Sequence, residues 1–433
     1  MRVLIVGSGG REHALAKAIA KSALHPVLYG IGVNAGMSAL AEMQDIKLSD
    51  HQAILTYAWS KQIDFAVIGP DQPLVDGLVD LLETGGIHCF GPTKRASRVE
   101  GSKAWAKAFM QRHHIPTPAY RVFTDIDEAK EYGATCPLPI VIKADGLALG
   151  KGVVIAEDRD TVFSTLTSMM VDHIHGMSGD TIVMEQFVTG PEVSLLVLCD
   201  GEHVLPLTSA MDHKRAWDGD TGPNTGGMGV VAPNPYYTQD VADGCMQHIV
   251  LPTIRGLKEE GSAFIGCLFF GLMLTPEGPV VIEYNCRFGD PEAEAVLALL
   301  DADVFDLLVS AREGALDTKS IHFHPGYAVS VTLASKGYPV ASEVGKTIHI
   351  GHLPFGSSVL HAAVKRSSDG TLTSTGGRVL HVVGRAETLT EARNLAYEAV
   401  KQVAFEGMHY RTDIGCRALE GEESDGSSGA VVS

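Results

Sequence analysis

The sequence predicts a multidomain protein that combines α/β and α+β folds, and three observations support this fold class. The first hundred residues alternate short apolar strands with amphipathic helices, which is typical of a doubly wound parallel sheet. Two apolar strands at 139–143 and 153–156 are joined by a glycine-rich loop, which indicates an antiparallel hairpin. The 433 residues correspond to two to four domains at roughly 100–200 residues each.

The N-terminal part, 1–101, is expected to form the doubly wound parallel-sheet domain. Its strands are short and fully apolar, and its helices carry apolar residues at helical spacing. Strands are expected at 3–6, 27–29, 65–68 and 87–90, and helices at 12–22, 54–60 and 74–83.

The middle of the chain is expected to hold a core that is interrupted by a small α+β subdomain. A helix at 102–113 ends before Pro116 and belongs to the core, together with 188–322. The inserted segment 120–187 contains the hairpin, a helix at 158–170 and a strand at 181–186, and we expect it to move as a lid. Core strands are expected at 193–199, 266–274 and 280–284, and core helices at 241–256, 293–300 and 304–313.

The last part of the chain, 323–419, is predicted to be a small mixed α/β domain. Its expected strands lie at 328–333 and 379–383, and a helix is expected at 389–404. The tail 420–433 is acidic and rich in Gly and Ser, so we expect it to be disordered.

Composition excludes several classes of function. A net charge of −18 repels nucleic acid, so a nucleic-acid partner is not expected. No apolar run is long enough to cross a bilayer, and the first residues lack the features of a secretory signal, so we expect a cytoplasmic protein without a membrane partner. The seven cysteines are scattered without a C-x-x-C pair, which argues against a disulfide framework or a zinc site.

The turn Gly7-Ser8-Gly9-Gly10 follows the first strand and precedes a helix. Glycines at such a turn let the backbone approach a phosphate, which the helix N-terminus then attracts. A dinucleotide fingerprint would have a third glycine where Glu12 stands and an acid near Tyr29-Gly30, so a nicotinamide cofactor is disfavoured. A phosphate contact is the favoured interpretation, and a tight turn that needs small residues is the alternative.

The loop after the strand 139–143 contains lysines at both ends, Lys143 and Lys151, around several glycines. Backbone N–H groups and lysines in this arrangement are suited to nucleotide phosphates, although the P-loop pattern is absent. The later strand 181–186 ends near Glu185, and Glu192 comes soon after, so adenine and ribose contacts are expected there. The alternative is an exposed hairpin with solvated lysines and surface acids.

Two further polar segments indicate binding chemistry. The loop 212–229 is long and rich in glycine, and its basic residues at 213–215 are suited to phosphate. Glu283 and Asn285 close a buried strand and lie on the same face, where they offer oxygen ligands suited to Mg²⁺ or Mn²⁺. The alternative for Glu283 is an internal ion pair with Arg287.

These motifs together resemble the glycinamide ribonucleotide synthetase family of the ATP-grasp superfamily. The resemblance covers roughly residues 1–416. It rests on VLIVGSGGREHALA, NAG, GPTKRASRVEGSKAWAK and IKADGLALGKGVVIA, and most specifically on DHKRAWDGDTGPNTGGMG and IEYNCRFGDPE. The fold that the resemblance implies is an ATP-grasp core with a mobile lid subdomain.

The resemblance also implies the roles of individual residues. Glu283 and Asn285 would bind one or two Mg²⁺ or Mn²⁺ ions, while Arg287, Asp290 and Lys151 would take part in catalysis. ATP would be bound by Lys103, Lys143, Gly150, Lys151, Gly152, Glu185, Phe187, Val188 and Glu192. The substrates glycine and 5-phosphoribosylamine would be bound by Gly9, Gly10, Arg11, Asn34, Gly36, Asp212, His213, Lys214, Thr225, Gly226, Gly227, Met228 and Gly229.

The reaction implied is the ATP-dependent ligation of glycine to 5-phosphoribosylamine through glycyl phosphate, which gives glycinamide ribonucleotide, ADP and phosphate for purine biosynthesis. A monomer or weak dimer is expected. The competing interpretations are another ATP-grasp ligase or carboxylase, a nicotinamide-dependent dehydrogenase, and an inactive binding or scaffold protein. The segment 212–229 favours the glycine ligase, and the intact lysines and metal pair argue against an inactive protein.

The chain departs from the family pattern at four places. Residues 30–33 stand where members usually have Ala-Pro-Gly before NAG, and Asp71 stands where a Glu is usual. Pro191 interrupts the usual acidic pair before Ser194, and Glu294 occupies a position that is commonly Gln. These departures affect the expected substrate contacts, above all near Glu294, and leave the nucleotide and metal residues intact.

Overall fold

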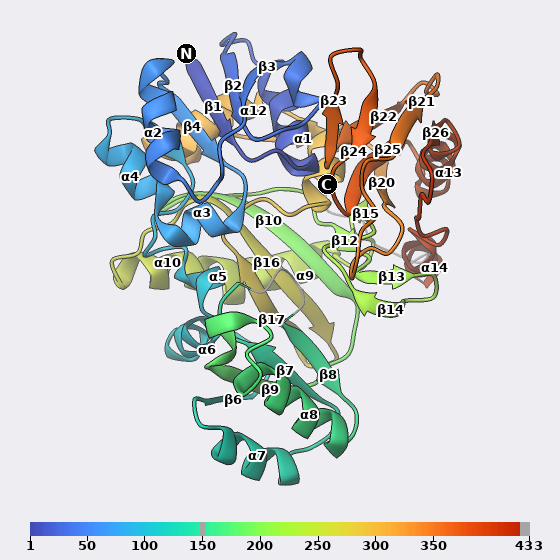
Figure 1. Cartoon of the computed structure of the whole chain (residues 1–433). Helices are drawn as coiled ribbons and strands as arrows, with labels where there is room; N and C mark the ends of the chain where they lie inside the picture. The colour runs from blue at the N-terminus through green and yellow to red at the C-terminus, as the bar shows by residue number, and fades with distance from the viewer. Residues whose placement is uncertain (148–151, 425–433) are drawn as a thin grey trace.

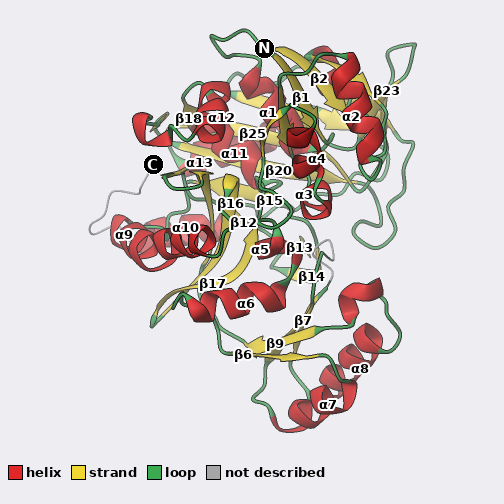
Figure 2. Ribbon diagram, turned by 90° about the vertical axis from the view of Figure 1, so that its left-hand side faces the viewer, coloured by secondary structure: helices red, strands yellow, loops and turns green. Residues whose placement is uncertain are grey.

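The computed structural model describes residues 1–147 and 152–424. Figure 1 shows three regions around a central set of strands: the N-terminal sheet, the C-terminal strands beside it, and a small subdomain that projects from the opposite end of the centre. Figure 2, turned by a quarter, shows the same subdomain standing apart from the rest, joined to the centre near β17 (Gly278–Asn285) and α6 (Lys103–Arg112).

The N-terminal region is a five-stranded parallel sheet with strand order β3-β2-β1-β4-β5, which confirms the doubly wound prediction. The strands β1 and β4 are fully apolar in their buried parts because helices cover both faces of the sheet. The elements are β1 (Arg2–Val6), α1 (Gly10–Ile19), β2 (Val27–Ile31), β3 (Ala41–Gln44), α2 (His51–Ser60), β4 (Phe65–Ile68), α3 (Asp71–Asp76), α4 (Leu78–Thr84) and β5 (His88–Phe90).

The central region is built on an antiparallel sheet with strand order β11-β10-β16-β17. Its long strands β10 (Glu192–Asp200) and β16 (Ile265–Thr275) are buried over most of their length. Helices pack around this sheet, and α11 also contacts α1 of the N-terminal region. The other elements are α5 (Arg98–Gly101), β11 (Val204–Pro206), α9 (Gln239–Cys245), α10 (Leu251–Glu259), α11 (Glu292–Leu299), β18 (Leu300–Asp301), α12 (Val304–Glu313) and β19 (His322–Phe323).

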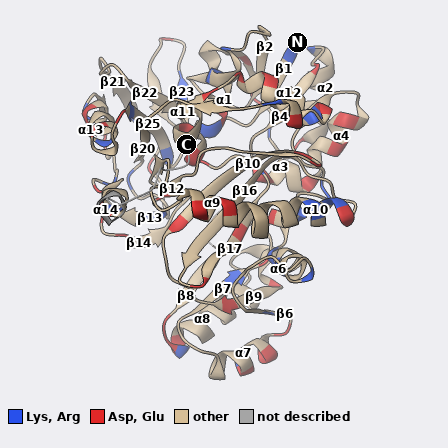
Figure 3. Ribbon diagram, turned by 180° about the vertical axis from the view of Figure 1, so that it is seen from behind, with Lys and Arg blue, Asp and Glu red and all other residues tan. Residues whose placement is uncertain are grey.

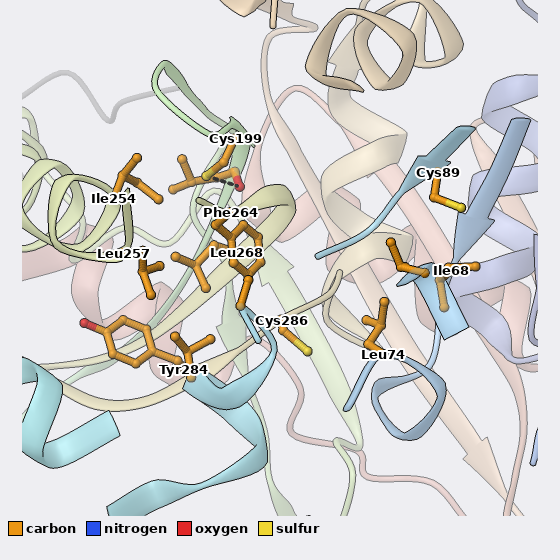
Figure 4. Packing of buried hydrophobic residues seen from close by; sticks show 14 of the residues in the cluster. Ile68, Leu74, Cys89, Cys199, Ile254, Leu257, Phe264, Leu268, Tyr284 and Cys286 are labelled. Carbon is orange, nitrogen blue, oxygen red and sulfur yellow. Dashed lines mark hydrogen bonds between the residues drawn. The ribbon is translucent and has the colours of Figure 1, made fainter. Parts of the chain in front are cut away.

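One hydrophobic core joins the N-terminal and central regions. Ile68 and Leu74 of the first region and Phe264, Leu268 and Tyr284 of the second belong to a single cluster of buried residues. Figure 4 shows these side chains in a continuous arrangement across the junction of the two sheets. Burial of apolar surface contributes about 25 cal/mol for each Å² removed from water, so this core holds the two regions together.

The inserted subdomain 120–187, which we continue to call the lid after its expected movement, forms in its described residues a four-stranded sheet of order β6-β9-β7-β8 with two helices against it. The predicted hairpin of β7 and β8 is confirmed as an antiparallel pair in which Lys143 lies opposite Val153. The lid has a separate small core around Leu166 and Ile182. Its elements are β6 (Tyr120–Phe123), α7 (Ile126–Thr135), β7 (Ile140–Ala144), β8 (Val153–Ala156), α8 (Arg159–Met170) and β9 (Ile182–Gln186).

The C-terminal strands share a sheet with the central region, in the order β12-β15-β20-β25-β22. Strands β12 and β15 come from the long glycine-rich segment, and β15 pairs with β20. The predicted domain boundary between residues 322 and 323 therefore separates strands that belong to one sheet. The elements are β12 (Met211–Asp212), β13 (Arg215–Trp217), β14 (Thr221–Asn224), β15 (Gly229–Ala232), β20 (Tyr327–Ala334), β21 (Thr347–Ile350), β22 (Ser357–His361), β23 (Val364–Arg366), β24 (Leu372–Ser374), β25 (Arg378–Ala386), α13 (Leu389–Val400), β26 (Val403–Ala404) and α14 (Cys416–Ser424).

Three predicted helices have different bounds in the structure. The helix expected at 74–83 is divided into α3 and α4 because Gly77 adopts a φ of 94°, which breaks the helical hydrogen bonding. The helix expected at 241–256 contains a π-helical turn, Met246–Val250, just before the proline of α10. The helix expected at 389–404 ends at Val400, and the following residues form β26, which pairs with β21.

The prediction of a disordered tail is wrong for its first part. The helix α14 includes residues 420–424, and its first turns are anchored because Ala418 is fully buried in the C-terminal core. The hydroxyl of Tyr236 donates a hydrogen bond to the carbonyl of Arg417 at 3.1 Å. An apolar anchor therefore outweighs the polar composition here, while residues 425–433 lie outside the described part of the chain.

Charged residues of both signs are interspersed over the surface helices (Figure 3). Among the described residues, no helix is both long enough and apolar enough to cross a membrane.

Candidate active site

Strand β17 ends with Glu283 beside a cluster of lysines. Gly271 lies opposite Glu283 on β16, and a side chain at Gly271 would press against the Glu283 side chain. The Nζ of Lys214 lies 3.5 Å from Glu283 Oε1 and 3.0 Å from Glu192 Oε2. About a third of each of the Glu283 and Lys214 side chains remains exposed, so Glu283 can still be reached by an ion.

The lysine cluster keeps Glu283 ionised. Lys214 is the main cause, and it outweighs burial, which acts in the opposite direction; Lys143 and Lys103 add to its effect. The pKa of Glu283 is lowered to about 2. A carboxylate that is charged at all physiological pH values is suited to a hard divalent cation.

Asn285 and Arg287 continue the same strand end, but Arg287 is paired elsewhere. Its Nη2 donates a hydrogen bond to Asn285 Oδ1 at 2.9 Å and lies 3.1 Å from Glu100 Oε1. A weaker contact of 3.7 Å joins the same nitrogen to Asp71 Oδ2. Among the described residues, the cation beside Glu283 is therefore Lys214, and the alternative of a Glu283–Arg287 ion pair is wrong.

The lid contributes a lysine that reaches the same strand. Lys143 of β7 donates a hydrogen bond from Nζ to the carbonyl of Ile282 at 2.9 Å, so lid and central sheet meet beside Glu283. Lys143 also forms an ion pair with Glu185 of β9, and Lys107 of α6 pairs with the other oxygen of Glu185. Glu185 is thus a buried carboxylate between two buried lysines.

These buried charges shift each other's pKa. Burial would raise the pKa of Glu185, but Lys143 and Lys107 hold it below its usual value. Burial lowers the pKa of Lys107 to about 8, although Glu185 opposes this shift. Lys107 was not among the predicted site residues, and only its place one helical turn after Lys103 could have indicated it.

Lys103 lies at the start of α6, against the base of the glycine loop. Its Nζ donates a hydrogen bond to the carbonyl of Gly146 at 2.6 Å. Asp145 accepts hydrogen bonds from the hydroxyl of Ser102 and the amide of Ala104, both at 3.0 Å. The loop is therefore fastened to the helix N-terminus at this end.

The remaining predicted nucleotide residues lie on either side of that loop. The carbonyl of Gly152 accepts a hydrogen bond from the amide of Ala144 at 2.9 Å, which closes the base of the hairpin. Phe187 and Val188 are half-buried directly after β9. Gly150 and Lys151 lie outside the described residues.

The N-terminal glycine turn holds an internal carboxylate. The amide of Gly9 donates a hydrogen bond to Glu12 Oε2 at 2.5 Å, and Arg11 Nε donates to Glu12 Oε1 at 2.7 Å. A side chain at Gly7, Gly9 or Gly69 would collide with Glu12. The glycines of this turn therefore make room for the Glu12 side chain.

Asn34 uses its side chain to join distant parts of the chain. Its Nδ2 donates to the carbonyls of Ser8 at 2.9 Å and His361 at 2.7 Å. Its Oδ1 accepts from the amides of Gly36 at 2.8 Å and Met37 at 3.0 Å. The side chain is 2 % exposed, so its hydrogen-bonding capacity is used within the protein.

The glycine-rich segment folds back on itself beside Lys214. The carbonyl of Lys214 accepts hydrogen bonds from the amide of Thr225 at 2.8 Å and its hydroxyl at 2.9 Å. The hydroxyl of Thr225 accepts from the amide of Gly227 at 3.0 Å, and the amide of Gly226 donates to the hydroxyl of Tyr338 at 3.1 Å. These hydrogen bonds fold the loop back on Lys214 just before strand β15 begins at Gly229. They therefore hold Lys214 near Glu283.

Other residues of this segment are placed differently. His213 and Met228 are buried, and the amide of Met228 donates to the carbonyl of His213 at 2.8 Å, so both belong to the core of the shared sheet. Asp212 is half-buried beside Glu292, and burial followed by the charge of Glu292 raises its pKa well above the usual value. Gly227 has a φ of 112°, and a side chain there would collide with Pro291.

Asp290 lies where the N-terminal, central and C-terminal regions of the molecule meet. The amide of Arg11 donates a long hydrogen bond of 3.5 Å to Asp290 Oδ2. Arg378 lies on β25, and its Nη2 is 3.0 Å from Asp290 Oδ1. Arg378 Nη1 also donates to the carbonyl of Asp290 at 2.7 Å. Although burial opposes ionisation, Arg378 holds the pKa of Asp290 below its usual value. Neither Arg378 nor its neighbour His381 was predicted from the sequence.

Comparison with known proteins identifies the family. Three family models match consecutive parts of the chain: the N domain of phosphoribosylglycinamide synthetase at 1–100, its ATP-grasp (A) domain at 101–293, and its C domain at 328–417. The chain belongs to the phosphoribosylglycinamide synthetase family. The ATP-grasp core implied by the sequence resemblance is confirmed.

Full-length relatives give the same result. The phosphoribosylamine–glycine ligase of Caulobacter vibrioides is 44% identical over 423 residues, which cover 97% of this chain and 99% of the relative. The phosphoribosylamine–glycine ligase of Escherichia coli O157:H7 is 41% identical over 431 residues, with 98% and 100% covered.

Solved structures resemble the whole fold. The crystal structure of phosphoribosylamine–glycine ligase from Thermotoga maritima has a TM-score of 0.82 and 35% identity, and covers 96% of this chain and 100% of its own. The biotin carboxylase domain of Hydrogenobacter thermophilus 2-oxoglutarate carboxylase, solved with MgADP, ADP and bicarbonate, has a TM-score of 0.76 over 97% of this chain and 98% of its own. At 17% identity the second likeness shows the fold alone.

Proposed function

We propose that the protein joins glycine to 5-phosphoribosylamine in an ATP-dependent reaction, as the names of its relatives describe. Family membership over nearly the whole chain supports this activity. The structural observation that carries the proposal is the contact of the lid residue Lys143 with the strand end at Glu283. This contact brings phosphate-binding charge and a permanently ionised carboxylate to one place.

The lysines around Glu283 are suited to the phosphates of ATP. Lys143 and Lys103 lie near the start of the glycine loop, and both help to keep Glu283 ionised. Their positive charge would neutralise phosphate oxygens as charge develops during transfer. Among the other predicted contacts, Glu192 lies beside Lys214 with its side chain 41 % exposed, so it can hydrogen-bond a ribose.

A divalent cation fits the strand end. Glu283 and Asn285 offer a carboxylate and an amide oxygen on the same face of β17, and Glu283 remains ionised and accessible. When bound there, Mg²⁺ or Mn²⁺ would neutralise charge on the nucleotide phosphates. We propose Mg²⁺ as the usual ion, because carboxylate and amide oxygens together with nucleotide phosphates are its preferred ligands.

The chemical sequence follows from the poor reactivity of a carboxylate toward amines. A carboxylate oxygen of glycine attacks the γ-phosphorus of ATP, and ADP leaves. The amine of phosphoribosylamine then attacks the carbonyl carbon, and phosphate leaves as the amide forms. The chain would hold these partners in place by the loop around Thr225, by Arg287 and by Asp290, and a closed lid would exclude water from the acyl phosphate.

The proposal is tested by measuring ADP release by the full chain with Mg²⁺, glycine and freshly prepared phosphoribosylamine. ADP release is expected only when both substrates are present, together with formation of glycinamide ribonucleotide. Omission of each substrate in turn is the control. ADP release that is independent of glycine or of phosphoribosylamine would reject the proposed activity.

We further propose a cytoplasmic location and a monomer or weak dimer. Six of the seven cysteines are buried and all seven are free, as expected for a protein in a reducing compartment. Sedimentation at several protein concentrations would give the oligomeric state.

A further inference from the structure

Three side chains from different elements converge beside the N-terminus of α1. Asp290 follows β17, Glu294 lies in the first turn of α11, and His381 lies on β25. The Nε2 of His381 is 3.6 Å from Asp290 Oδ1 and 3.6 Å from Glu294 Oε1. One ligand atom from each residue lies within 4.8 Å of the other two.

The carboxylate of Glu294 and the Nε2 of His381 are buried without hydrogen-bond partners. The side chains of Glu294 and His381 have no exposed surface, and that of Asp290 is 13 % exposed. Among the described residues, no hydrogen bond is made by either carboxylate oxygen of Glu294 or by His381 Nε2, while Asp290 Oδ1 has its ion pair with Arg378 at 3.0 Å. A buried polar atom without a partner costs free energy, so a group that binds the oxygens of Glu294 and the Nε2 of His381 would stabilise this region.

The charges around the cluster leave an excess of carboxylate. Arg378 is the cation nearest to Asp290, and Arg11 already pairs with Glu12. Arg378 forms its ion pair with Asp290, and among the described residues no Lys or Arg forms an ion pair with Glu294, so the Glu294 carboxylate lacks a paired cation. A proton on Glu294 or a bound cation would restore the balance.

The histidine is oriented in the way that a metal ligand requires. The hydroxyl of Thr332 lies 3.1 Å from His381 Nδ1. When Nδ1 carries the proton and donates it to Thr332, the lone pair of Nε2 points toward the two carboxylates. Metal-bound histidines are held by this kind of hydrogen bond from the other ring nitrogen.

The N-terminus of α1 closes the third side of the cluster. A side chain at Gly10 would overlap the ring of His381 and the Oε1 of Glu294, so the backbone of Gly10 packs directly against them. The cluster is therefore shared among the N-terminal sheet, the central region and the C-terminal strands.

We propose that Asp290, Glu294 and His381 bind a divalent transition-metal ion, with Zn²⁺ or Mn²⁺ as the favoured ions. The two carboxylate oxygens each lie 3.6 Å from His381 Nε2 and within 4.8 Å of one another, so small side-chain shifts would let all three atoms reach the usual zinc–ligand distance of about 2.1 Å. One imidazole and two carboxylates suit these ions better than Mg²⁺, which prefers oxygen alone. This site is separate from Glu283 and Asn285, and its ion would be bound without nucleotide.

The test is metal uptake by the full chain in the absence of nucleotide. The metal-stripped protein is incubated with Zn²⁺ or Co²⁺ and separated from free ion, and bound metal is measured by elemental mass spectrometry. We expect one ion per chain, and with Co²⁺ a visible absorption band that indicates four or five ligands. Glu294→Gln and His381→Ala should each weaken binding about tenfold or more.

Two variants provide matched controls. Glu283→Gln removes a ligand of the proposed nucleotide-associated site and should leave nucleotide-free uptake unchanged. His361→Gln removes another buried histidine, outside the cluster, and should also leave it unchanged. Glu294→Gln nearly preserves side-chain size, so its result can be interpreted even if His381→Ala is poorly folded.

Two results would overturn the proposal. One is a wild-type protein that takes up no ion, which would mean that a proton on Glu294 balances the charge instead. The other is uptake by Glu294→Gln with the affinity of the wild type. Anomalous diffraction from a zinc-loaded crystal should place the ion between Asp290, Glu294 and His381.

Discussion

At the scale of single residues, the candidate active site is a set of buried charges that depend on one another. Lys214 lies between Glu192 and Glu283, and Glu185 lies between Lys143 and Lys107. A carboxylate in such a position remains ionised despite burial because the opposite charges compensate for lost hydration. Removal of one partner therefore changes the charge balance of the whole site.

Glu283→Gln tests the proposed metal ligand. The amide keeps the size of the side chain but removes the negative charge that attracts a divalent ion. Loss of groups that only support metal ligands costs 10–100-fold, so loss of a direct ligand should lower ADP formation by about 100-fold or more. Steady-state kinetics over a range of Mg²⁺ concentrations measures this effect. The exposed acid variant Glu202→Gln should behave like the wild type, and normal activity of Glu283→Gln at low Mg²⁺ would refute the assignment.

Lys107→Met tests the buried pair that sequence analysis missed. Methionine fills a similar volume but leaves Glu185 with Lys143 as its remaining cation. Breaking a buried pair costs about 3 kcal/mol or more, so the free energy of unfolding should fall by about this amount in urea titrations. The KM for ATP should rise, since Lys143 would be drawn more strongly to Glu185. Lys258→Met, at an exposed pair with Glu202, should change neither quantity. An unaltered unfolding midpoint in Lys107→Met would contradict this account.

At the scale of elements, the base of the glycine loop is fastened to helix α6. Asp145 accepts hydrogen bonds from Ser102 and Ala104, and Lys103 bonds the carbonyl of Gly146. The loop thus begins from a fixed point on the central region rather than on the lid alone.

Asp145→Ala tests this attachment. The amide of Ala104 loses its acceptor at the helix N-terminus, so hydrogen exchange in residues 103–112 should become faster, with a stability loss of about 1 kcal/mol. The KM for ATP should rise because Lys103 loses its fixed position. Asp125→Ala is the matched control, because it removes the N-cap of the lid helix α7, where Asp125 accepts from the amides of Asp127 and Glu128. If both variants raise the KM equally, the attachment at Asp145 has no special role in nucleotide binding.

Local patterns were sufficient to predict most elements but not their ends. The parallel strands of the first region and the hairpin of β7 and β8 follow from apolar runs and glycine placement. The break at Gly77 depends on a positive φ that a helical pattern does not reveal. The end of α13 depends on the pairing of β26 with β21, which is a contact between distant segments. Tertiary contacts decide such boundaries.

At the scale of the whole molecule, the first and last regions are joined by buried polar contacts. Asn34 links the glycine turn to the backbone of His361. The Nδ1 of His13 accepts a hydrogen bond from the amide of His361 at 2.8 Å, and the two rings meet edge to face. Burial first, and then the charges of His361 and Lys17, lower the pKa of His13 from 6.5 to about 3.

This shift makes stability depend on pH in a defined direction. Between pH 6.5 and about 3, the unfolded chain binds a proton at His13 that the folded chain does not, so stability falls as the pH falls through this window. His13→Gln removes the difference. Between pH 7.5 and 5.5, the free energy of unfolding should fall by about 1 kcal/mol less in His13→Gln than in the wild type.

Urea unfolding at the two pH values measures this difference. The buried acids titrate in both proteins, so their contribution cancels when the two changes in unfolding free energy are subtracted. His88→Gln, at a side chain that is 64 % exposed, should show the pH dependence of the wild type. An identical pH dependence in wild type and His13→Gln would show that His13 is not held neutral by burial.

The candidate site could be predicted only where its residues lie together in sequence. Glu283, Asn285 and Asp290 fall within one motif, and Lys143 stands at the start of a recognisable loop. Lys107, Glu100, Arg378 and His381 enter the site only because distant elements pack against that motif. Asn34 shows the converse: its motif is evident, but its side chain is used to join regions of the fold.

The sheet shared by β15 and β25 has a consequence for the way the protein is made. A ribosome that has synthesised residues 1–322 has already produced the lysines and carboxylates around Glu283, but neither Arg378 nor His381. Asp290 then lacks the cation that lies beside it in the finished fold, and β15 lacks its neighbour β20. Synthesis that stops before β25 therefore yields a chain that contains the nucleotide residues but lacks the two side chains that face Asp290 from the C-terminal strands.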